Sequence, residues 1–220
     1  MRLPGGEPDR GPWRAVPVTE VLGLLTAGRP VPPTRPWVVA VDGRGGSGKS
    51  TLAGALAAAA GPRATVLHTD DAAWHHSFFD WDPMLVEHVL EPARAGRAVR
   101  FTPPAWRERG REGAIEVPAG CELLLVEGCA AARRRLEPHL DAAVWVQSDM
   151  DVADGRMHHR DSDDAEAMAV MAEWNAAELT LLTAERAWER ATVVVAGTPP
   201  TPPPPGHVVV GAVSGRGARG

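Results

Sequence analysis

A glycine-rich stretch between residues 43 and 50 carries the clearest chemical signal in this sequence. It follows the pattern G-x-x-x-x-G-K-[ST], the P-loop or Walker A motif, which binds phosphate. Its glycines can adopt positive φ and bring backbone N–H groups against phosphate oxygens, and the following helix N-terminus adds partial positive charge. ATP, bound with Mg²⁺, is therefore the expected ligand. The residues expected to bind ATP are Gly43, Arg44, Gly45, Gly46, Ser47, Gly48, Lys49, Ser50 and Thr51.

Lys49 is the only lysine among the 23 Lys and Arg residues of the chain. A compact ammonium on a flexible stem suits the β- and γ-phosphates better than a planar guanidinium does. We therefore expect Lys49 to be catalytic and the hydroxyl of Ser50 to ligate Mg²⁺. The alternative is a glycine-rich turn that ends in Lys-Ser by chance.

The elements around the motif favour the P-loop interpretation. Residues 37–41 (WVVAV) are typical of a strand that is buried on both faces. Residues 51–60 (TLAGALAAAA) are strong helix formers without a breaker. Lys49 and Ser50 are therefore expected in the first turn of a helix that follows a buried strand.

Acidic side chains follow two other apolar segments. Residues 64–68 predict a strand that ends before Asp70 and Asp71, and residues 122–126 predict one that ends before Glu127. Ligands of a doubly wound sheet bind at the carboxyl ends of its strands, so these carboxylates should face the P-loop. Asp70 is the candidate catalytic base, with Asp71 as its rival, although such a pair can also be only a helix cap. Glu127 can hold Mg²⁺.

Two arginines are spaced to act together on phosphate. Arg156 and Arg160 lie four residues apart in a predicted helix at 152–160, so they share one face. This spacing suits a lid that clamps phosphates, and both are assigned as catalytic. The alternative is an ordinary solvated helix face.

The rest of the chain alternates strand-like and helix-like segments. Strands are expected at 142–146 and 192–196, and helices at 18–27, 84–95, 131–140 and 163–187. Residues 98–117 are expected to form a small inserted lobe. This alternation predicts an α/β, three-layer P-loop NTPase fold with a mainly parallel sheet.

Proline and glycine mark the ends of the predicted domain. Residues 1–35 are expected to form an N-terminal arm with a short helix, and residues 36–198 the P-loop kinase domain. Residues 199–220 continue the run TPPTPPPPG, which begins at Thr198. Polyproline has no internal hydrogen bonds, so this Pro/Gly-rich tail is expected to be mobile and dispensable.

The overall composition restricts the partners. The net charge of −5 argues against nucleic acid or an anionic membrane as a partner. No apolar run reaches the roughly 18 residues of a transmembrane helix, and the N-terminal residues lack a signal-peptide core, so a cytoplasmic location is expected. The expected partner is a small-molecule acceptor, and the sequence does not indicate an oligomeric state.

Taken with these motifs, the chain resembles the uridine kinase family of P-loop nucleoside kinases, especially uridine kinase-like proteins of high-GC bacteria. The resemblance covers about residues 36–198. It is strongest over residues 41–52 (VDGRGGSGKSTL), 67–82 (LHTDDAAWHHSFFDWD), 102–113 and 125–128 (LVEG). It implies ATP-dependent phosphoryl transfer to the 5′-hydroxyl of a pyrimidine nucleoside, either uridine or cytidine.

The resemblance also implies roles for single residues. The family's aspartate after the second strand, which is both the catalytic base and a Mg²⁺ partner, matches Asp70. The glutamate of its later E-G pair assists the metal and matches Glu127. Its lid arginines match Arg156 and Arg160.

The acceptor site departs from the family pattern. An acidic residue that holds the ribose hydroxyls falls on Asp80 or Asp82, but the family's tyrosine shortly after the base is replaced by Trp74. The expected acceptor-binding residues are Asp80, Asp82, Trp74, Trp106, Arg107 and Arg109. The alternatives are a kinase for another small hydroxyl metabolite and a non-catalytic nucleotide-binding regulator. The aspartate at position 70 disfavours the regulator, because a switch needs no base aimed at a second substrate.

Overall fold

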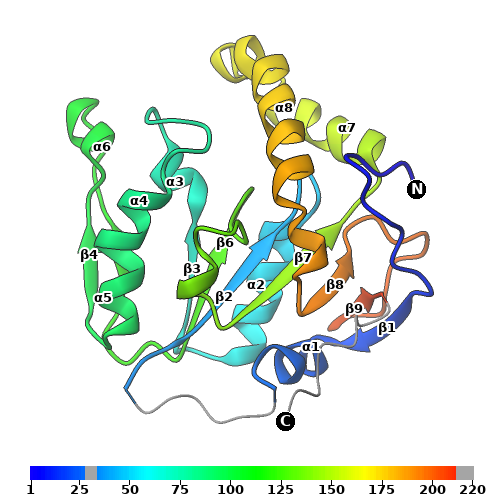
Figure 1. The fold of residues 1–220 in the computed structure, drawn as a ribbon, viewed down its shortest axis with the longest axis horizontal. Helices are drawn as coiled ribbons and strands as arrows, with labels where there is room; N and C mark the ends of the chain where they lie inside the picture. The colour runs from blue at the N-terminus through cyan, green and yellow to red at the C-terminus, as the bar shows by residue number, and fades with distance from the viewer. Residues whose placement is uncertain (28–33, 212–220) are drawn as a thin grey trace.

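The computed structural model describes residues 1–27 and 34–211. Seven strands form one sheet in the order β1-β9-β8-β7-β2-β6-β3 (Figure 1). Their bounds are β1 (Arg14–Pro17), β2 (Trp37–Asp42), β3 (Ala64–His68), β6 (Leu123–Glu127), β7 (Ala142–Gln147), β8 (Val193–Ala196) and β9 (His207–Val210). The pairs from β3 through β8 are parallel, whereas β9 and β1 are added antiparallel at one edge. The α/β fold with a mainly parallel sheet is as predicted.

Helices cover both faces of this sheet. The longer helices are α1 (Val18–Leu25), α2 (Lys49–Ala60), α7 (Met150–Asp161) and α8 (Ala165–Glu185). Val39 and Val41 of β2 share a core with Leu52 and Leu56 of α2. The alternate residues Val38 and Ala40 belong to the core on the opposite face. This alternation, which follows from the two-residue period of a strand, confirms the three layers.

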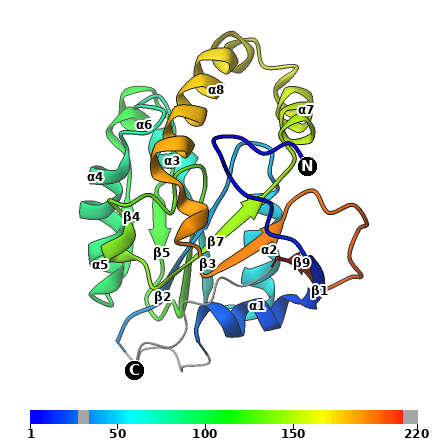
Figure 2. The ribbon, with the colours of Figure 1, turned by 45° about the vertical axis from the view of Figure 1, so that its right-hand side comes forward.

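The strand and helix around the P-loop agree with the sequence. All six residues of β2 are buried. Helix α2 begins at Lys49 after Gly48, whose φ is 97°, so Lys49 and Ser50 lie in its first turn. Figures 1 and 2 show α7 and the upper part of α8 above the carboxyl ends of β2 and β7.

The segment between β3 and β6 contains the inserted lobe. It contains α3 (Thr69–Ala73), a helical run made of α4 (Asp82–Leu85), a π-helical turn (Val86–Leu90) and α5 (Glu91–Arg94), then β4 (Val99–Phe101), α6 (Pro104–Glu108) and β5 (Ile115–Val117). Strands β4 and β5 pair only with each other among the described residues. A small lobe at 98–117 is therefore present.

Two expectations were wrong. The helix predicted at 131–140 is instead a series of turns with a short 3-10 helix, Glu137–His139. Its start is held in turns because Ala130 has a φ of 69° and the N–H groups of Ala130 and Ala132 donate to Asp42.

The second wrong expectation is the mobile tail predicted at residues 199–220. Residues 207–210 form β9, which pairs with β1 over four positions, and Val208 and Val210 of this strand pack in the core. The boundary predicted at residue 198 therefore does not coincide with the end of the sheet, and residues 212–220 lie outside the described residues. Among the described helices, none has the length and apolar character needed to cross a membrane.

Candidate functional site

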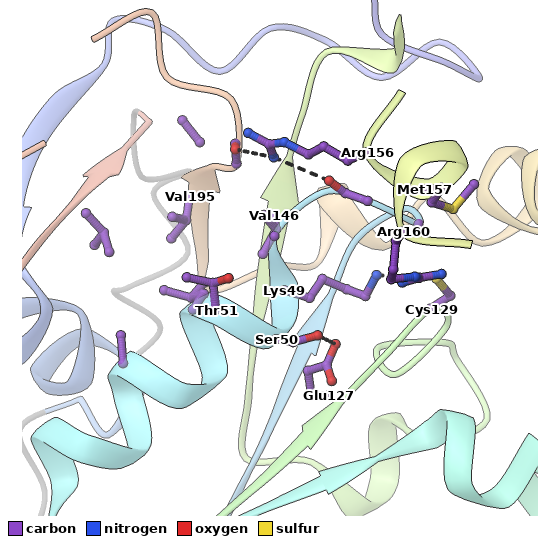
Figure 3. Close-up of a pocket in the computed structure, with 18 of the residues that line it drawn as sticks. Lys49, Ser50, Thr51, Glu127, Cys129, Val146, Arg156, Met157, Arg160 and Val195 are labelled. Atoms are coloured by element: carbon purple, nitrogen blue, oxygen red, sulfur yellow. Dashed lines mark hydrogen bonds between the residues drawn. The ribbon is translucent and has the colours of Figure 1, made fainter. Parts of the chain in front are cut away.

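Lys49 projects into the P-loop that precedes it (Figure 3). Its Nζ donates to the carbonyl oxygen of Arg44 at 2.8 Å and lies 3.3 Å from Sγ of Cys129. Burial lowers the pKa of Lys49, but nearby acidic groups, led by Cys129 and Glu127, outweigh it and raise the pKa above its ordinary value. Lys49 is therefore a buried ammonium held at the phosphate-binding loop.

The P-loop lies directly beneath α7 and α8. A Cβ at Gly45 would lie 2.1 Å from Sδ of Met157. At Gly46, where φ is 70°, a Cβ would lie 2.1 Å from the carbonyl oxygen of Ala153. Glycine is therefore required at Gly46 by its positive φ and by the backbone of α7, whereas a side chain at Gly45 would force Met157 and Trp174 to move.

Two carboxylates on these helices hold the loop. The N–H of Gly45 donates to Oε1 of Glu178 at 2.6 Å. Arg44 pairs with Asp154 at 2.7 Å and with Glu178 at 3.6 Å. Glu178 is only 1% exposed, and no local sequence motif predicted its role.

Oxygen ligands suited to Mg²⁺ lie beside Lys49. Ser50 Oγ donates to Oε1 of Glu127 at 3.2 Å, and Oε2 of Glu127 lies 2.5 Å from Nδ1 of His68. Burial raises the pKa of Glu127, but the hydrogen bond with His68 and the charge of Lys49 outweigh it and hold the pKa below its ordinary value. A hydroxyl and an ionised carboxylate fit a hard cation such as Mg²⁺.

Asp70 and Asp71 face different parts of the molecule. Asp70 lines the cavity that contains the P-loop. Asp70 is exposed to the solvent of this cavity, and partial desolvation by the surrounding protein raises its pKa, whereas the charge of Lys49 offsets part of that effect. Asp71 instead accepts a hydrogen bond from Arg111 at 2.5 Å. This geometry favours Asp70 over Asp71 as the candidate base.

Both lid arginines line the same cavity, which has a volume of about 750 Å³. Arg156 donates to the carbonyl oxygens of Gly46 at 3.3 Å and Gly197 at 3.0 Å. Arg160 is paired with the neighbouring Asp161 at 2.6 Å. Figure 3 shows both arginines on the side of the cavity that faces the P-loop.

A second, smaller cavity of about 220 Å³ also opens on Asp70. Aromatic side chains dominate its lining: Trp74, Phe78, Phe79, Trp81 and Trp174. Trp174 comes from α8 and also lines the large cavity. Its position was not predicted, because α8 carries no motif that marks it.

The two acidic residues expected to hold a ribose lie elsewhere. Asp82 is 2% exposed and its carboxylate pairs with Arg133 at 2.7 Å and with Arg135 at 3.5 Å. Asp80 is exposed and accepts a hydrogen bond from Ser77 Oγ at 3.2 Å. Neither lines the small cavity as the structure describes it.

Three further predicted acceptor residues lie on the inserted lobe. Trp106 is buried, and its Nε1 donates to the carbonyl oxygen of Asp71 at 2.9 Å. The guanidinium of Arg111 stacks on it, 3.5 Å from the ring centroid. Arg107 donates to the carbonyl oxygen of Thr102 at 3.0 Å, and Arg109 is exposed. In the described part of the chain, only Trp74 of the predicted acceptor residues lines the small cavity.

No family model and no curated protein sequence matches the chain. Solved structures do match. A "putative fructose transport system kinase" from Silicibacter sp. TM1040 is 25% identical with a TM-score of 0.55, covering 79% of this chain and 94% of that one. A "possible uridine kinase" from Bacillus stearothermophilus is 18% identical with a TM-score of 0.52, covering 80% of this chain and 97% of that one.

These likenesses define the class of protein. The fold is that of the P-loop kinases. The likeness to the Silicibacter structure supports a kinase, whereas the Bacillus structure supports the fold alone.

Proposed function

We propose that this chain is an ATP-dependent kinase that transfers a phosphoryl group to a hydroxyl of a small molecule. One observation carries the proposal: Asp70 lines both cavities. The large cavity contains the P-loop, Lys49 and both lid arginines, and the small aromatic cavity can take a second substrate. Phosphoryl transfer requires the donor and the acceptor to lie side by side, and a carboxylate where they meet can accept the proton of the acceptor hydroxyl.

Each side chain then has a definite task. Asp70 accepts the proton of the attacking hydroxyl, because it lies where the two cavities meet. Lys49, Arg156 and Arg160 stabilise the charge that develops on the transferred group. Ser50, Glu127 and Asp70 would hold Mg²⁺, which neutralises phosphate charge when bound.

Within this class we propose a pyrimidine nucleoside, uridine or cytidine, as the acceptor, phosphorylated at its 5′-hydroxyl. The support is the wall of Trp74, Phe79 and Trp174, because a planar base packs well on aromatic rings. A second candidate is another small hydroxyl metabolite such as a sugar. The ion pair between Asp82 and Arg133 favours it, since that pair occupies the carboxylate expected to bind a ribose.

The test is ADP release by the purified protein with a panel of nucleosides, sugars and small alcohols. Asp70→Asn should abolish stimulation by the true acceptor but preserve ATP binding, because the amide cannot take a proton. Asp71→Asn is the matched control and should have a much smaller effect, since Asp71 pairs with Arg111. Lys49→Met should lower turnover by about two orders of magnitude or more without lowering the melting temperature equally.

The outcomes separate the alternatives. Stimulation by uridine or cytidine supports the nucleoside. Stimulation by a non-nucleoside alcohol alone rejects the nucleoside and supports the second candidate. ATP binding without acceptor-stimulated ADP release across the panel contradicts a kinase and favours a nucleotide-binding regulator.

A further inference from the structure

His68 and Glu127 are neighbours at the carboxyl ends of two parallel strands. Strand β3 pairs with β6, and the register places His68 opposite Glu127. Side chains at paired positions of adjacent strands point to the same face of a sheet. The side chain of Glu127 is 6% exposed and that of His68 is 48% exposed. A half-exposed imidazole therefore lies against a buried carboxylate.

This pair lies on the face of the sheet that carries the P-loop helix. Leu125, two residues before Glu127, packs in the same core as Leu56 of α2. The two-residue period of a strand therefore directs Glu127 toward α2 as well. Ser50, in the first turn of α2, lies beside Glu127 (Figure 3). Strand register and strand period thus bring the imidazole, the carboxylate and the P-loop hydroxyl together.

Each oxygen of the Glu127 carboxylate has its own partner. Oε1 accepts from Oγ of Ser50 at 3.2 Å, and Oε2 lies 2.5 Å from Nδ1 of His68. A carboxylate can only accept hydrogen bonds, so Nδ1 must carry the hydrogen and donate it. With both oxygens held, the carboxylate cannot rotate about its last bond without breaking one of these contacts.

The orientation that results suits a magnesium ion. Two neighbouring oxygen ligands of an octahedral Mg²⁺ lie about 3 Å apart. Oγ of Ser50 and Oε1 of Glu127, at 3.2 Å, are close to that spacing. The bond from His68 keeps Oε2 turned away from Ser50 and leaves Oε1 beside it.

We propose that His68 is a positioning residue, which fixes the rotation of the Glu127 carboxylate so that Oε1 stays beside Ser50 at the metal site. This inference rests on the proposed function, because it takes Ser50 and Glu127 to hold the Mg²⁺ of MgATP. His68 acts on the metal through Glu127. Removing such a hydrogen-bond partner of a metal-binding side chain typically costs about 10- to 100-fold in metal affinity.

The test measures how much Mg²⁺ strengthens ATP binding. Calorimetric titration of the full chain with ATP, in excess Mg²⁺ and in EDTA, gives two affinities, and their ratio isolates the contribution of the metal. This ratio should exceed one in the wild type. His68→Leu should lower the ratio about tenfold, while the affinity in EDTA changes by less than about threefold. A purely structural pair would lower the melting temperature and leave the ratio unchanged.

Two further variants serve as matched controls. His68→Asn places a side-chain N–H donor at the position of Nδ1, so it should keep most of the wild-type ratio. His76→Ala changes another exposed histidine that does not line either described cavity, so it should leave both the ratio and the melting temperature unchanged. In a Glu127→Ala background, His68→Leu should have no further effect on the ratio, because the carboxylate that His68 positions is gone.

The outcomes separate this role from the proposed function. An unchanged ratio in His68→Leu, or equal losses in His68→Leu and His68→Asn, would overturn the positioning role and leave the kinase proposal intact. A loss that persists in the Glu127→Ala background would also overturn it, because His68 would then act without Glu127. Wild-type protein that binds no ATP in either condition, or binds it equally in both, would instead overturn the proposed use of MgATP, and the role of His68 with it.

Discussion

The side chain of Glu178 accepts a hydrogen bond from the N–H of Gly45 at 2.6 Å, across 133 residues of sequence. It also lies 3.3 Å from Sγ of Cys129, which in turn lies 3.3 Å from Nζ of Lys49. The long helix α8 is thereby joined to the phosphate-binding loop. A movement of α8 would therefore move the backbone of the P-loop at Gly45.

Glu178→Gln tests the charge of this contact without removing its shape. The amide oxygen can still accept from Gly45, but a negative charge near the triphosphate is removed. We therefore expect ATP to bind a few times more tightly in calorimetric titrations. Glu178→Ala is the comparison, and it should lower the melting temperature because it leaves the buried Gly45 N–H and Arg44 without this acceptor. Equal weakening of ATP binding in both variants would contradict the role of charge.

The buried pair of Asp82 and Arg133 should act on stability. Their side chains are 3% and 9% exposed, and removing one partner leaves an uncompensated buried charge. Asp82→Ala should therefore lower the free energy of unfolding by about 3–5 kcal/mol, as measured in urea. A normal stability combined with a raised KM for the acceptor alone would return Asp82 to the acceptor site.

The features that the sequence predicted are those set by local pattern. The P-loop spacing places Lys49 at the start of a helix. One apolar run is followed by Asp70 and another by Glu127, and both carboxylates therefore lie at the same edge of a parallel sheet. The roles of Asp82 and Glu178 depend on partners far along the chain, at Arg133 and Gly45, so no local pattern reveals them. The ribose assignment of Asp82 relied on local sequence alone, which cannot show a partner 51 residues away.

Strand β9 shows the same limit at the C-terminus. Polyproline correctly indicates an irregular connection, but the strand that follows it depends on pairing with β1, nearly 200 residues earlier in the chain. The sequence of the segment His207–Val210, which follows the proline run, indicates neither its partner strand nor its place at the edge of the sheet.

Truncation after Thr198 should destabilise the protein, contrary to the expectation from sequence. It removes β9, including Val209 and Val210, which are 9% and 0% exposed. Burial of each such side chain contributes about 1.5–3 kcal/mol, so the melting temperature should fall by many degrees. Truncation after Gly211 is the matched control, because it retains every described pairing of β9. Equal melting temperatures for the two truncated proteins would show that β9 contributes little.

Asp42 should give the protein a distinct pH dependence. It ends β2, and its carboxylate accepts hydrogen bonds from the N–H groups of Gly43, Ala130 and Ala132 at 2.7, 2.9 and 2.9 Å. Burial raises its pKa from 3.8 to about 6, although the backbone hydrogen bonds offset part of this effect. The native state therefore holds this proton more tightly than the unfolded chain does. The resulting stabilisation is fully present below the unfolded pKa of 3.8 and is lost as the pH rises through about 6.

Asp42→Asn removes this titration. The variant should be less stable than the wild type, because the side-chain NH2 of the introduced asparagine must face one of the three backbone N–H donors. The difference in unfolding free energy between wild type and variant should shrink between about pH 4 and about pH 8, since only the wild type loses the proton-linked term. Urea unfolding at both pH values measures this difference, and an NMR titration of the Asp42 carboxyl carbon in the wild type provides the control. A difference that stays constant or grows with pH would contradict the assignment.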